Sequence, residues 1–219
     1  MLFELDSVTL SRGGREVLRD LTASLPEGAS CVAGPSGCGK SSLLRLLNRL
    51  ADPDRGTVTY RGADVRERDV LELRREVCLV PQLPALLDGT VADNVRFAGQ
   101  LAGRDPDVER LLDLAGLGAS YAARDSSRLS VGEQQRAMLA RGLALEPDVL
   151  LLDEPTSALD DDARGAVEAT LVDLRERVEV SIVLVTHDLE QARRMSDWVV
   201  RLDRGQVARQ GPAHELLPA

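Results

Sequence analysis

Nine residues from Gly34 to Ser42 read GPSGCGKSS and have the composition of a phosphate-binding loop. Glycines let the backbone turn tightly enough for several N–H groups to converge on phosphate oxygens, and a following helix presents its positive end to the same anion. The stretch satisfies the pattern G-x-x-x-x-G-K-[ST], with a strand-like apolar run before it and a helix-like run after it. We therefore expect the following residues to bind a nucleotide: Gly34, Pro35, Ser36, Gly37, Cys38, Gly39, Lys40, Ser41 and Ser42.

Lys40 is the only lysine among the 27 lysine and arginine residues of the chain. A compact ammonium on a slim stem can pass through the loop to the β- and γ-phosphates, whereas the planar fork of arginine needs a wider opening. Ser41 offers a hydroxyl to Mg²⁺. Cys38 occupies an unconstrained position, and we interpret it as a small filler rather than a redox switch. The alternative, a chance glycine-rich turn, is disfavoured by the flanking strand, the flanking helix and the lone lysine together.

The apolar run 149–152 leads directly into two carboxylates, Asp153 and Glu154. Buried carboxylates are costly unless a cation compensates them, so Asp153 is a candidate ligand of Mg²⁺ through its water shell. Glu154 is the candidate general base that takes a proton from an attacking water. The alternative is an ordinary strand end with two solvated acidic side chains. The presence of the phosphate loop in the same chain disfavours this alternative.

His187 ends the apolar run SIVLVTH in a chain with two histidines. Ligands of open α/β folds bind at the carboxyl ends of the strands, so His187 is a candidate for a hydrogen bond to the γ-phosphate and the water. A lone histidine is more often a structural residue, and that alternative stays open without the other motifs. We assign no role to His214.

The stretch LSVGEQQR, residues 129–136, contains Ser130-x-x-Glu133, which by itself predicts only a capped helix start. Together with the phosphate loop and the Asp-Glu strand, it makes the chain resemble the ATP-binding subunit of ABC transporters. The resemblance covers about residues 3–211. The motifs follow that family's order, which is GPSGCGKS, PQ at Gln82, LSVGEQQR, LLLDEPTSALD and VTHD.

This resemblance implies an ATPase with ATP and Mg²⁺ as cofactors, in which Lys40, Gln82, Glu154 and His187 are catalytic. Gln82 would contact Mg²⁺ and sense the γ-phosphate. Cassettes of the family dimerise head to tail around two nucleotides, so the signature would cap ATP held by a second copy. A helix N-terminus favours an anion in front of it. The residues that the resemblance adds on this side are Ser130, Gly132, Glu133 and, at the interface between the two sites, Asp160.

Three positions depart from the family's commonest pattern. Val131 stands where glycine is usual, and Glu133 stands where glutamine is usual, but the contacting Ser130 and Gly132 are retained. The family also carries an aromatic residue, which packs on adenine, just before the glycines of the first turn. Arg12 occupies that place in SRGG. A guanidinium can stack on a base, so we expect Arg12 to take that role, although the base preference stays open.

The surrounding pattern predicts an α/β fold. Strands are expected over 2–10, 16–25, 29–34, 57–62, 77–82, 149–154 and 181–187, with a closing hairpin over 198–211. The Val-, Ile- and Leu-rich runs are typical of parallel strands buried on both faces. Helices are expected over 41–50 and 162–178, and the segment 83–145 is expected to be helical throughout, with Thr90 and Asp93 in a capping box. The predicted architecture is a single domain, 1–219. It has a P-loop NTPase core with a mixed, mainly parallel sheet, an N-terminal antiparallel β subdomain, and an α-helical subdomain inserted at about 83–145.

Composition limits the possible partners. The net charge of −9 argues against a nucleic-acid binder, which normally shows a basic face. The three cysteines form no C-x-x-C pair, which favours a reducing compartment without disulfides. The beginning of the chain lacks the layout of a signal peptide, and no apolar run reaches the roughly 20 residues of a membrane helix. We expect a cytoplasmic protein, peripheral on the inner face of the cell membrane, whose partners are a second copy and a polytopic permease.

The leading hypothesis is an ATPase that powers a separate membrane subunit. Alternatives are a soluble ATPase of the same superfamily in DNA repair, chromosome organisation or translation, a cassette that regulates cell division at the membrane, and a small-molecule kinase. The stretch VPQLPALLDGTVADNVRFAG resembles cassettes paired with a metal exporter, so a metal such as iron is the expected substrate, with phosphate and amino-acid import cassettes close to it. No regulatory domain is expected after residue 211.

Overall fold

The computed structural model describes residues 1–217, and its centre is a six-stranded sheet in the order β10-β9-β3-β8-β7-β6. Strands β6, β7, β8, β3 and β9 run parallel to their neighbours, and β10 is an antiparallel edge strand. The sheet is therefore mixed and mainly parallel, as the sequence predicts. Its strands are β3 (Ala29–Ala33), β6 (Val77–Val80), β7 (Val149–Asp153), β8 (Ser181–Thr186), β9 (Trp198–Asp203) and β10 (Gln206–Pro212).

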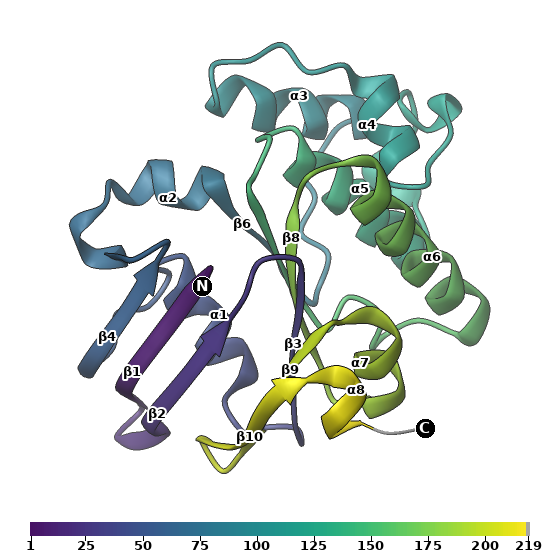
Figure 1. The fold of residues 1–219 in the computed structure, drawn as a ribbon. Coiled ribbons are helices and arrows are strands. Elements are labelled where there is room, and N and C mark those ends of the chain that lie inside the picture. Colours follow the sequence, from purple (N-terminus) through teal and green to yellow (C-terminus); the bar gives the residue numbers. More distant parts are fainter. Residues whose placement is uncertain (218–219) are drawn as a thin grey trace.

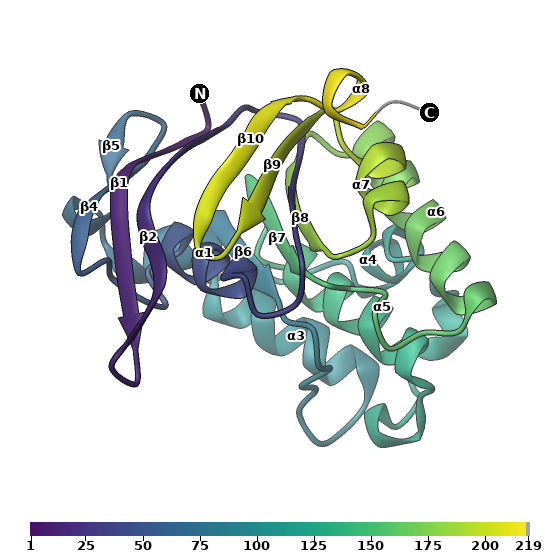
Figure 2. The ribbon, with the colours of Figure 1, turned by 90° about the horizontal axis from the view of Figure 1, so that it is seen from below.

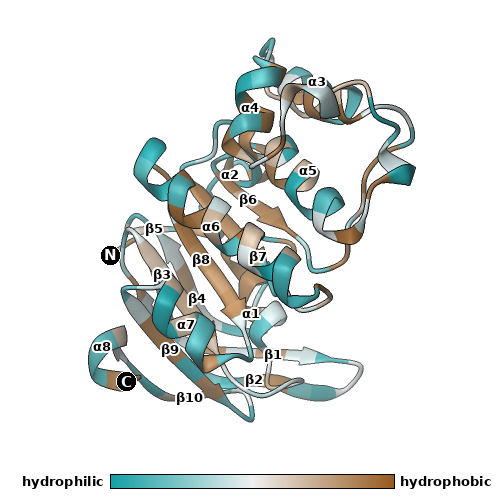
Figure 3. Cartoon of the chain, turned by 90° about the vertical axis from the view of Figure 1, so that its right-hand side faces the viewer, coloured by the Kyte–Doolittle hydropathy of each residue, from teal (hydrophilic) through white to brown (hydrophobic). Residues whose placement is uncertain are grey.

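The central strands are buried because helices or a second sheet cover both of their faces. Every residue of β3 and β7 is buried, which is the burial pattern of parallel strands covered on both sides. Figure 3 shows hydrophobic colours along β6 and β8, whereas α7 (Leu189–Met195) on the outside is largely hydrophilic.

A second, antiparallel sheet has the order β2-β1-β4-β5 and lies beside the central sheet (Figure 1). Its strands are β1 (Phe3–Arg12), β2 (Arg15–Leu25), β4 (Arg55–Tyr60) and β5 (Ala63–Asp64). The backbone N–H of Ser24 in β2 donates to Gln210 Oε1 in β10 at 2.9 Å, which joins the two sheets. This sheet is the predicted N-terminal antiparallel part.

The two larger apolar cores flank the central sheet, on opposite faces. One contains Leu43 of α1 (Lys40–Leu47) and side chains of the antiparallel sheet. The other contains Leu139 of α5 (Val131–Leu143) and Leu171 of α6 (Asp161–Arg177). Figure 2 shows the two sheets side by side, with α5 and α6 on the side of the central sheet away from β1 and β2. The remaining short helices are α2 (Val70–Glu76), α8 (Ala213–Leu216), η1 (Val65–Glu67), η2 (Ala119–Tyr121) and η3 (Ser126–Arg128).

The segment 83–145 contains α3 (Val91–Leu101), α4 (Val108–Leu114) and α5. The prediction that it is helical throughout is wrong, because 83–89 is irregular and the connections before α4 and α5 are turns and short 3₁₀ helices. Pro84 and Gly89 disfavour a helix before Thr90, and Pro106 disfavours one before α4. Thr90 does cap α3 in a box with Asp93, as predicted.

Three predicted strands, β3, β7 and β8, end one residue earlier than expected. Strand β7 ends at Asp153 and β8 ends at Thr186, so Glu154 and His187 begin the connections that follow. Glu154 has φ of 46°, a left-handed conformation outside the region of regular strand backbone. Helices α2 and α7 were not predicted. None of the helices within residues 1–217 is long and apolar enough to cross a membrane.

Candidate active site

The phosphate loop connects β3 to α1, and its glycines are required by the geometry. Gly39 is the N-cap of α1 at φ of 110°, and a Cβ there would lie 2.7 Å from Leu18 Cδ2. A Cβ on Gly34 would lie 2.4 Å from the carbonyl oxygen of Leu202. Both positions therefore exclude any side chain. The loop keeps its N–H groups at the start of an eight-residue helix, where they favour an anion.

The ammonium of Lys40 is held at the loop rather than in solvent. Its Nζ donates to the carbonyl oxygens of Gly34 at 2.9 Å and Pro35 at 3.1 Å. It also lies 3.3 Å from Glu154 Oε1, and the Lys40 side chain is 4% exposed. Water screens this charge weakly, so an anion that enters the loop would experience most of it.

Ser41 and Asp153 form a second contact in the same place. The hydroxyl of Ser41 donates to Asp153 Oδ1 at 2.8 Å, which links the start of α1 to the end of β7. Burial raises the pKa of the Asp153 carboxyl above its ordinary value, the Ser41 hydrogen bond opposes that shift, and the nearby charge of Glu154 adds to it. A cation at this point would remove the cost of the buried charge.

Glu154 lies between Lys40 and His187. Its Oε1 faces Lys40, and its Oε2 is 3.1 Å from His187 Nδ1. Its side chain is 14% exposed, whereas that of His187 is 52% exposed. The left-handed φ of Glu154 costs free energy on the order of 1–3 kcal/mol, and its amide donates to the carbonyl oxygen of Val185 at 3.1 Å. Strain of this kind is typical of functional positions.

Gln82 reaches the same site from the end of β6. Its Nε2 donates to Ser157 Oγ at 3.0 Å, and the hydroxyl of Ser157 donates to the carbonyl oxygen of Glu154 at 3.1 Å. Gln82, Glu154 and the loop together surround an open hollow of about 320 Å³. The hollow is lined by Val17, Ser36, Gly37, Gly39, Lys40, Ser41, Ser42, Gln82 and Glu154.

The signature residues lie elsewhere, at the start of α5. Ser130 is the N-cap and Glu133 completes a capping box with it. Gly132 packs on α6, where a Cβ would lie 3.3 Å from Ala163 Cβ. Asp160 caps α6 by accepting from the Ala163 amide at 2.8 Å. None of these four residues lines the hollow at the phosphate loop.

Arg12 is exposed at the end of β1, opposite Arg15 in the hairpin, and it does not line the hollow. Val17 of β2 lines it instead, a residue that the motifs do not single out. A second residue that the sequence did not indicate is the buried Gln191 of α7. Its Nε2 donates to Thr156 Oγ1 at 2.7 Å, which braces the chain just after Glu154. Neither residue carries a local signal, because both contacts depend on tertiary packing.

Cys38 is buried within the loop, and burial raises the pKa of its thiol. The neighbouring charge of Lys40 opposes that shift. A Cβ at Gly34 would lie 2.9 Å from Cys38 Sγ, so the sulfur fills the inside of the turn. This packing agrees with the interpretation of Cys38 as a small filler.

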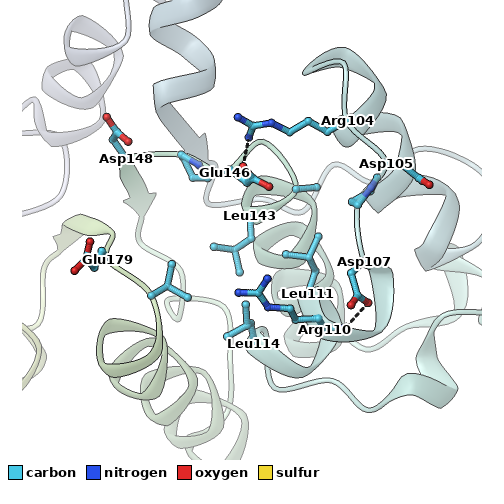
Figure 4. A pocket seen from close by; sticks show the side chains of 14 residues that line it. Arg104, Asp105, Asp107, Arg110, Leu111, Leu114, Leu143, Glu146, Asp148 and Glu179 are labelled. Carbon is cyan, nitrogen blue, oxygen red and sulfur yellow. Dashed lines mark hydrogen bonds and ion pairs between the residues drawn. The ribbon is translucent and has the colours of Figure 1, made fainter.

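A more enclosed hollow, of about 490 Å³, lies between α4 and the connection from α5 to β7 (Figure 4). Leu111 and Leu143 form part of its lining, and Arg104 pairs with Glu146 at 2.7 Å on its edge. No residue predicted for catalysis or nucleotide binding lines it. This hollow is therefore separate from the one at the phosphate loop.

With this geometry in place, comparison with known proteins decides the family. The family model described as "ABC transporter" matches residues 18–157, which is more than half of the chain. The chain belongs to the ABC transporter family. The predicted family is thus confirmed, and with it the class of ATP-binding ATPases.

Several curated relatives of this ABC cassette are similar over nearly its whole length. Protein STAR1 of rice is 47% identical over 94% of this chain, and the chain spans 61% of that protein. ABC transporter I family member 17 of Arabidopsis thaliana is 44% identical, over 92% of this chain and 78% of the relative. Glycine betaine uptake system ATP-binding protein YehX of Escherichia coli is 37% identical, over 96% of this chain and 70% of the relative.

Solved structures support the fold of the cassette. The cbiO1 protein of Clostridium perfringens, part of the ABC transporter complex cbiONQ, matches with a TM-score of 0.88. The match covers 98% of this chain and 90% of that chain at 24% identity, so it shows the shared fold. A bacterial Atm1-family ABC exporter with ATP bound matches with a TM-score of 0.85 and 29% identity, over 98% of this chain and 39% of the exporter. The predicted α/β fold class is confirmed.

Proposed function

We propose that this cassette binds and hydrolyses Mg-ATP and that it uses the resulting change of state to drive a separate membrane-spanning subunit. The observation that carries the proposal is the position of Glu154. Its carboxylate lies at the end of a buried parallel strand, 3.3 Å from Lys40 Nζ and 3.1 Å from His187 Nδ1, on the border of the hollow at the phosphate loop. A base, a cation and a second hydrogen-bonding group thus converge where a γ-phosphate would lie.

Binding depends on groups that are already in place. The backbone N–H groups of the loop and the positive end of α1 would hold the phosphates. Lys40 would exchange its carbonyl partners, Gly34 and Pro35, for β- and γ-phosphate oxygens without leaving the loop. Val17 is the apolar residue at the border of the hollow, so it rather than Arg12 is placed to contact the nucleoside.

The residues at the loop fit a magnesium ion. Within residues 1–217, no three His, Cys, Asp or Glu side chains cluster as a metal site of their own. This suits Mg²⁺, which keeps several waters and takes substrate phosphates as ligands. Ser41 and Asp153 would hold the ion, directly and through water, and Gln82 would complete the set. When bound, Mg²⁺ neutralises charge that develops on the phosphate oxygens.

Glu154 is the general base in this proposal, and it takes a proton from a water aligned with the γ-phosphorus. His187 donates a hydrogen bond to the γ-phosphate and holds one face of the Glu154 carboxylate. Ser157, which contacts both Gln82 and the Glu154 carbonyl oxygen, keeps the two catalytic connections in register. General-base catalysis of this kind contributes roughly 10²–10⁴ in rate.

A single copy leaves the γ-phosphate side of the hollow open, because Ser130 and Gly132 lie at the start of α5 and not at the loop. A second copy, packed head to tail, would bring its Ser130 hydroxyl and the free N–H groups of its α5 to that side. Asp160, at the start of α6, would then lie near the interface. ATP therefore joins the two copies, and hydrolysis releases them.

The membrane partner would dock in a groove of about 600 Å³ between α3 and the end of α1. Phe97 and Leu101 are 45% and 56% exposed there, and Arg45, Arg74 and Arg141 also line the groove. This combination fits an amphipathic helix with an acidic side chain, presented by a cytoplasmic loop of a polytopic permease. Such docking would place the cassette on the inner face of the membrane.

The groove is connected to the active site through the chain itself. Pro81 and Leu87 line the groove, and Gln82 lies between them at the hollow. A shift of the docked helix would therefore move Gln82, and loss of the γ-phosphate would move the residues on either side of Gln82 that line the groove. This is the coupling that a transporter needs.

The transported substrate stays a prediction. The expected metal, such as iron, is one of several chemistries among the similar proteins, whose names refer to glycine betaine, aliphatic sulfonates, Fe(3+) ions and phosphate. The chain's own residues carry no substrate site in this proposal, because the permease would hold the substrate. Purification with that permease, followed by transport assays with each class, tests the metal prediction.

The nucleotide part of the proposal is tested with the purified chain and two variants of Lys40. At one hundred times its Kd, Mg-ATP should stabilise the chain by about 2.7 kcal/mol, or about 5–10 °C for a protein of this size. Lys40→Ala should lose this shift and the hydrolysis. Lys40→Arg keeps the charge but not the slim stem, and it should lose most of both. A Lys40→Arg variant with normal turnover would contradict the proposed role of the loop.

The transport part needs a separate test. A tagged chain should co-purify from detergent-solubilised membranes with a polytopic protein, and Phe97→Glu with Leu101→Glu should abolish that association. Hydrolysis by the isolated variant should stay unchanged, since neither residue lines the hollow. A chain recovered only in membrane-free complexes would refute the transport role and leave the ATPase assignment standing.

A further inference from the structure

The serine of the signature, Ser130, has its hydroxyl fixed by its own helix. Ser130 Oγ accepts a hydrogen bond from the Glu133 amide at 3.3 Å, and the Ser130 amide donates to Glu133 Oε2 at 2.8 Å. Among the described residues, Ser130 Oγ donates to no protein acceptor, so its proton is available to an incoming oxygen. The Glu133 carboxylate holds the Ser130 amide, so the place where that carboxylate is held affects the position of the Ser130 backbone that carries this donor.

The other oxygen of Glu133 is held by a residue outside the helix. Tyr121 Oη donates to Glu133 Oε1 at 2.6 Å. The guanidinium of Arg124 lies 3.8 Å from the centre of the Tyr121 ring and 3.6 Å from the same carboxylate oxygen. The carboxylate thus has one oxygen on the Ser130 amide and one on the pair Tyr121 and Arg124.

Charge and proton position agree with this arrangement. The hydrogen bond from Tyr121, and then the one from the Ser130 amide, lower the pKa of Glu133, while the same bond to Glu133 raises the pKa of Tyr121. Near neutral pH the tyrosine is therefore the donor and the carboxylate the acceptor. A bond from a neutral hydroxyl to a charged oxygen is stronger than one between neutral groups.

Tyr121 and Arg124 are themselves attached to the rest of the helical part. The amides of Val91 and Ala92, at the start of α3, donate to the carbonyl oxygens of Arg124 and Ala122, both at 3.0 Å. Thr90 also forms an isolated antiparallel bridge with Asp125. The segment that holds Glu133 is therefore anchored on a second helix, α3, as well as on α5.

We infer that Tyr121, supported by Arg124, is a positioning residue that aims the Ser130 hydroxyl at the γ-phosphate bound by the facing copy. It acts through Glu133 and touches no nucleotide itself. Its second effect is electrostatic, since it keeps the negative charge of Glu133 turned away from an approaching phosphate. This inference rests on the cross-subunit site of the proposed function.

The experiment measures dimer formation by the full chain in a Glu154→Gln background, in which bound ATP is expected to be consumed only slowly. Sedimentation of this parent in saturating Mg-ATP gives the dimer dissociation constant. Tyr121→Phe, which removes one hydroxyl, should raise that dissociation constant about tenfold. The reason is that a displaced Ser130 hydroxyl would lose most of its interaction with the γ-phosphate. Binding of a fluorescent ATP analogue by the monomer should be unchanged, since Tyr121 is not at the loop.

A matched control removes a tyrosine hydroxyl from another carboxylate. Tyr60 Oη donates to Asp148 Oδ2 at 3.4 Å, far along the chain from the signature, and Tyr60→Phe should leave dimer formation unchanged. Thermal unfolding of each variant shows that it is folded. A double-mutant cycle then separates positioning from general stability. Tyr121→Phe should have no further effect in a Glu133→Ala background, where the carboxylate is absent.

The outcomes distinguish this inference from the proposal beneath it. If the parent dimerises with ATP and Tyr121→Phe dimerises equally well, the positioning role is overturned and the cross-subunit site stands. An equal loss from Tyr121→Phe with and without Glu133 overturns it as well, because Tyr121 would then act independently of the carboxylate. If the parent stays monomeric in saturating Mg-ATP, the cross-subunit site itself is refuted, and the positioning role with it.

Discussion

Replacing Glu154 with glutamine tests the catalytic assignment most directly. The amide keeps the size of the side chain and is no better suited to a left-handed backbone, so the strain at φ of 46° is unchanged. It cannot take a proton from water at neutral pH. Loss of a general base slows reactions by roughly 10²–10⁴, which corresponds to about 2.7–5.4 kcal/mol at 1.36 kcal/mol per tenfold. We expect the rate of phosphate release at saturating Mg-ATP to fall by that factor.

Nucleotide binding should survive the same change. Lys40 loses its partner at 3.3 Å but keeps the carbonyl oxygens of Gly34 and Pro35, which hold the ammonium at the loop. The thermal shift by Mg-ATP should therefore match that of the parent. The substitution should not weaken nucleotide binding, because it removes a negative charge that repels the γ-phosphate.

The assay needs single-turnover and steady-state measurements, so that slow chemistry is separated from slow product release. Asp173→Asn serves as the matched acid-to-amide control, because the Asp173 side chain is 54% exposed on the outside of α6. Its turnover should equal that of the parent. A Glu154→Gln variant that hydrolyses ATP within threefold of the parent rate would refute the assignment of Glu154 as the general base. Another group would then have to accept the proton from the attacking water.

Two further predictions concern stability and thiol reactivity. Gly39→Ala should lower the free energy of unfolding, measured in urea, by about 1–3 kcal/mol, because the new Cβ would lie 2.7 Å from Leu18 Cδ2. Gly165→Ala in α6, where the new Cβ meets no atom within 4 Å, should raise that free energy by about 0.5–1 kcal/mol. Equal effects of the two substitutions would contradict the argument from available space. Burial raises the pKa of Cys31 to about 12 and that of Cys78 to about 11. At pH 8 the thiolate form of both is therefore scarce, and a thiol reagent should label them only after denaturation. Rapid labelling of either cysteine in the native protein would contradict their burial.

The sequence predicted those features that depend on local pattern. The strands β3, β7 and β8 are short, mainly apolar runs rich in Val, Leu and Ala, and the glycine-rich loop follows β3 directly. Because the carboxyl ends of parallel strands share one edge, Lys40, Asp153 and Glu154 could be expected together once the sheet was assigned. The contacts among them agree with that expectation, although their catalytic roles stay predictions.

The parts that were missed depend on weak or distant signals. Only Leu73 of α2 is buried, so its sequence carries little helical periodicity. The segment 83–145 was expected to be helical throughout because its apolar residues recur at helical spacing, but the loops between its helices bury side chains too. The contact between Tyr121 and Glu133 spans twelve residues and two turns, and no period in the sequence indicates it.

Arg12 shows the limit of transferring a position from a resemblance. Its place in the hairpin matches that of the family's aromatic residue, but in the structure it is exposed at the end of β1 and does not line the hollow at the loop. Val17, five residues later on the neighbouring strand, lines the hollow instead. The motif indicates the hairpin that lies beside the nucleotide. Which residue of that hairpin faces the hollow depends on its twist and its bulges, and the pairing of β1 with β2 contains several register shifts.

The single lysine has a practical consequence for labelling chemistry. Every other basic side chain is arginine or histidine, and the amine of Lys40 is only 4% exposed beneath the carbonyl oxygens of its loop. Acylating reagents and amine crosslinkers therefore meet no accessible lysine side chain on the folded protein. Any adduct at position 40 would report that the loop had opened, and its suppression by Mg-ATP would give a direct footprint of occupancy.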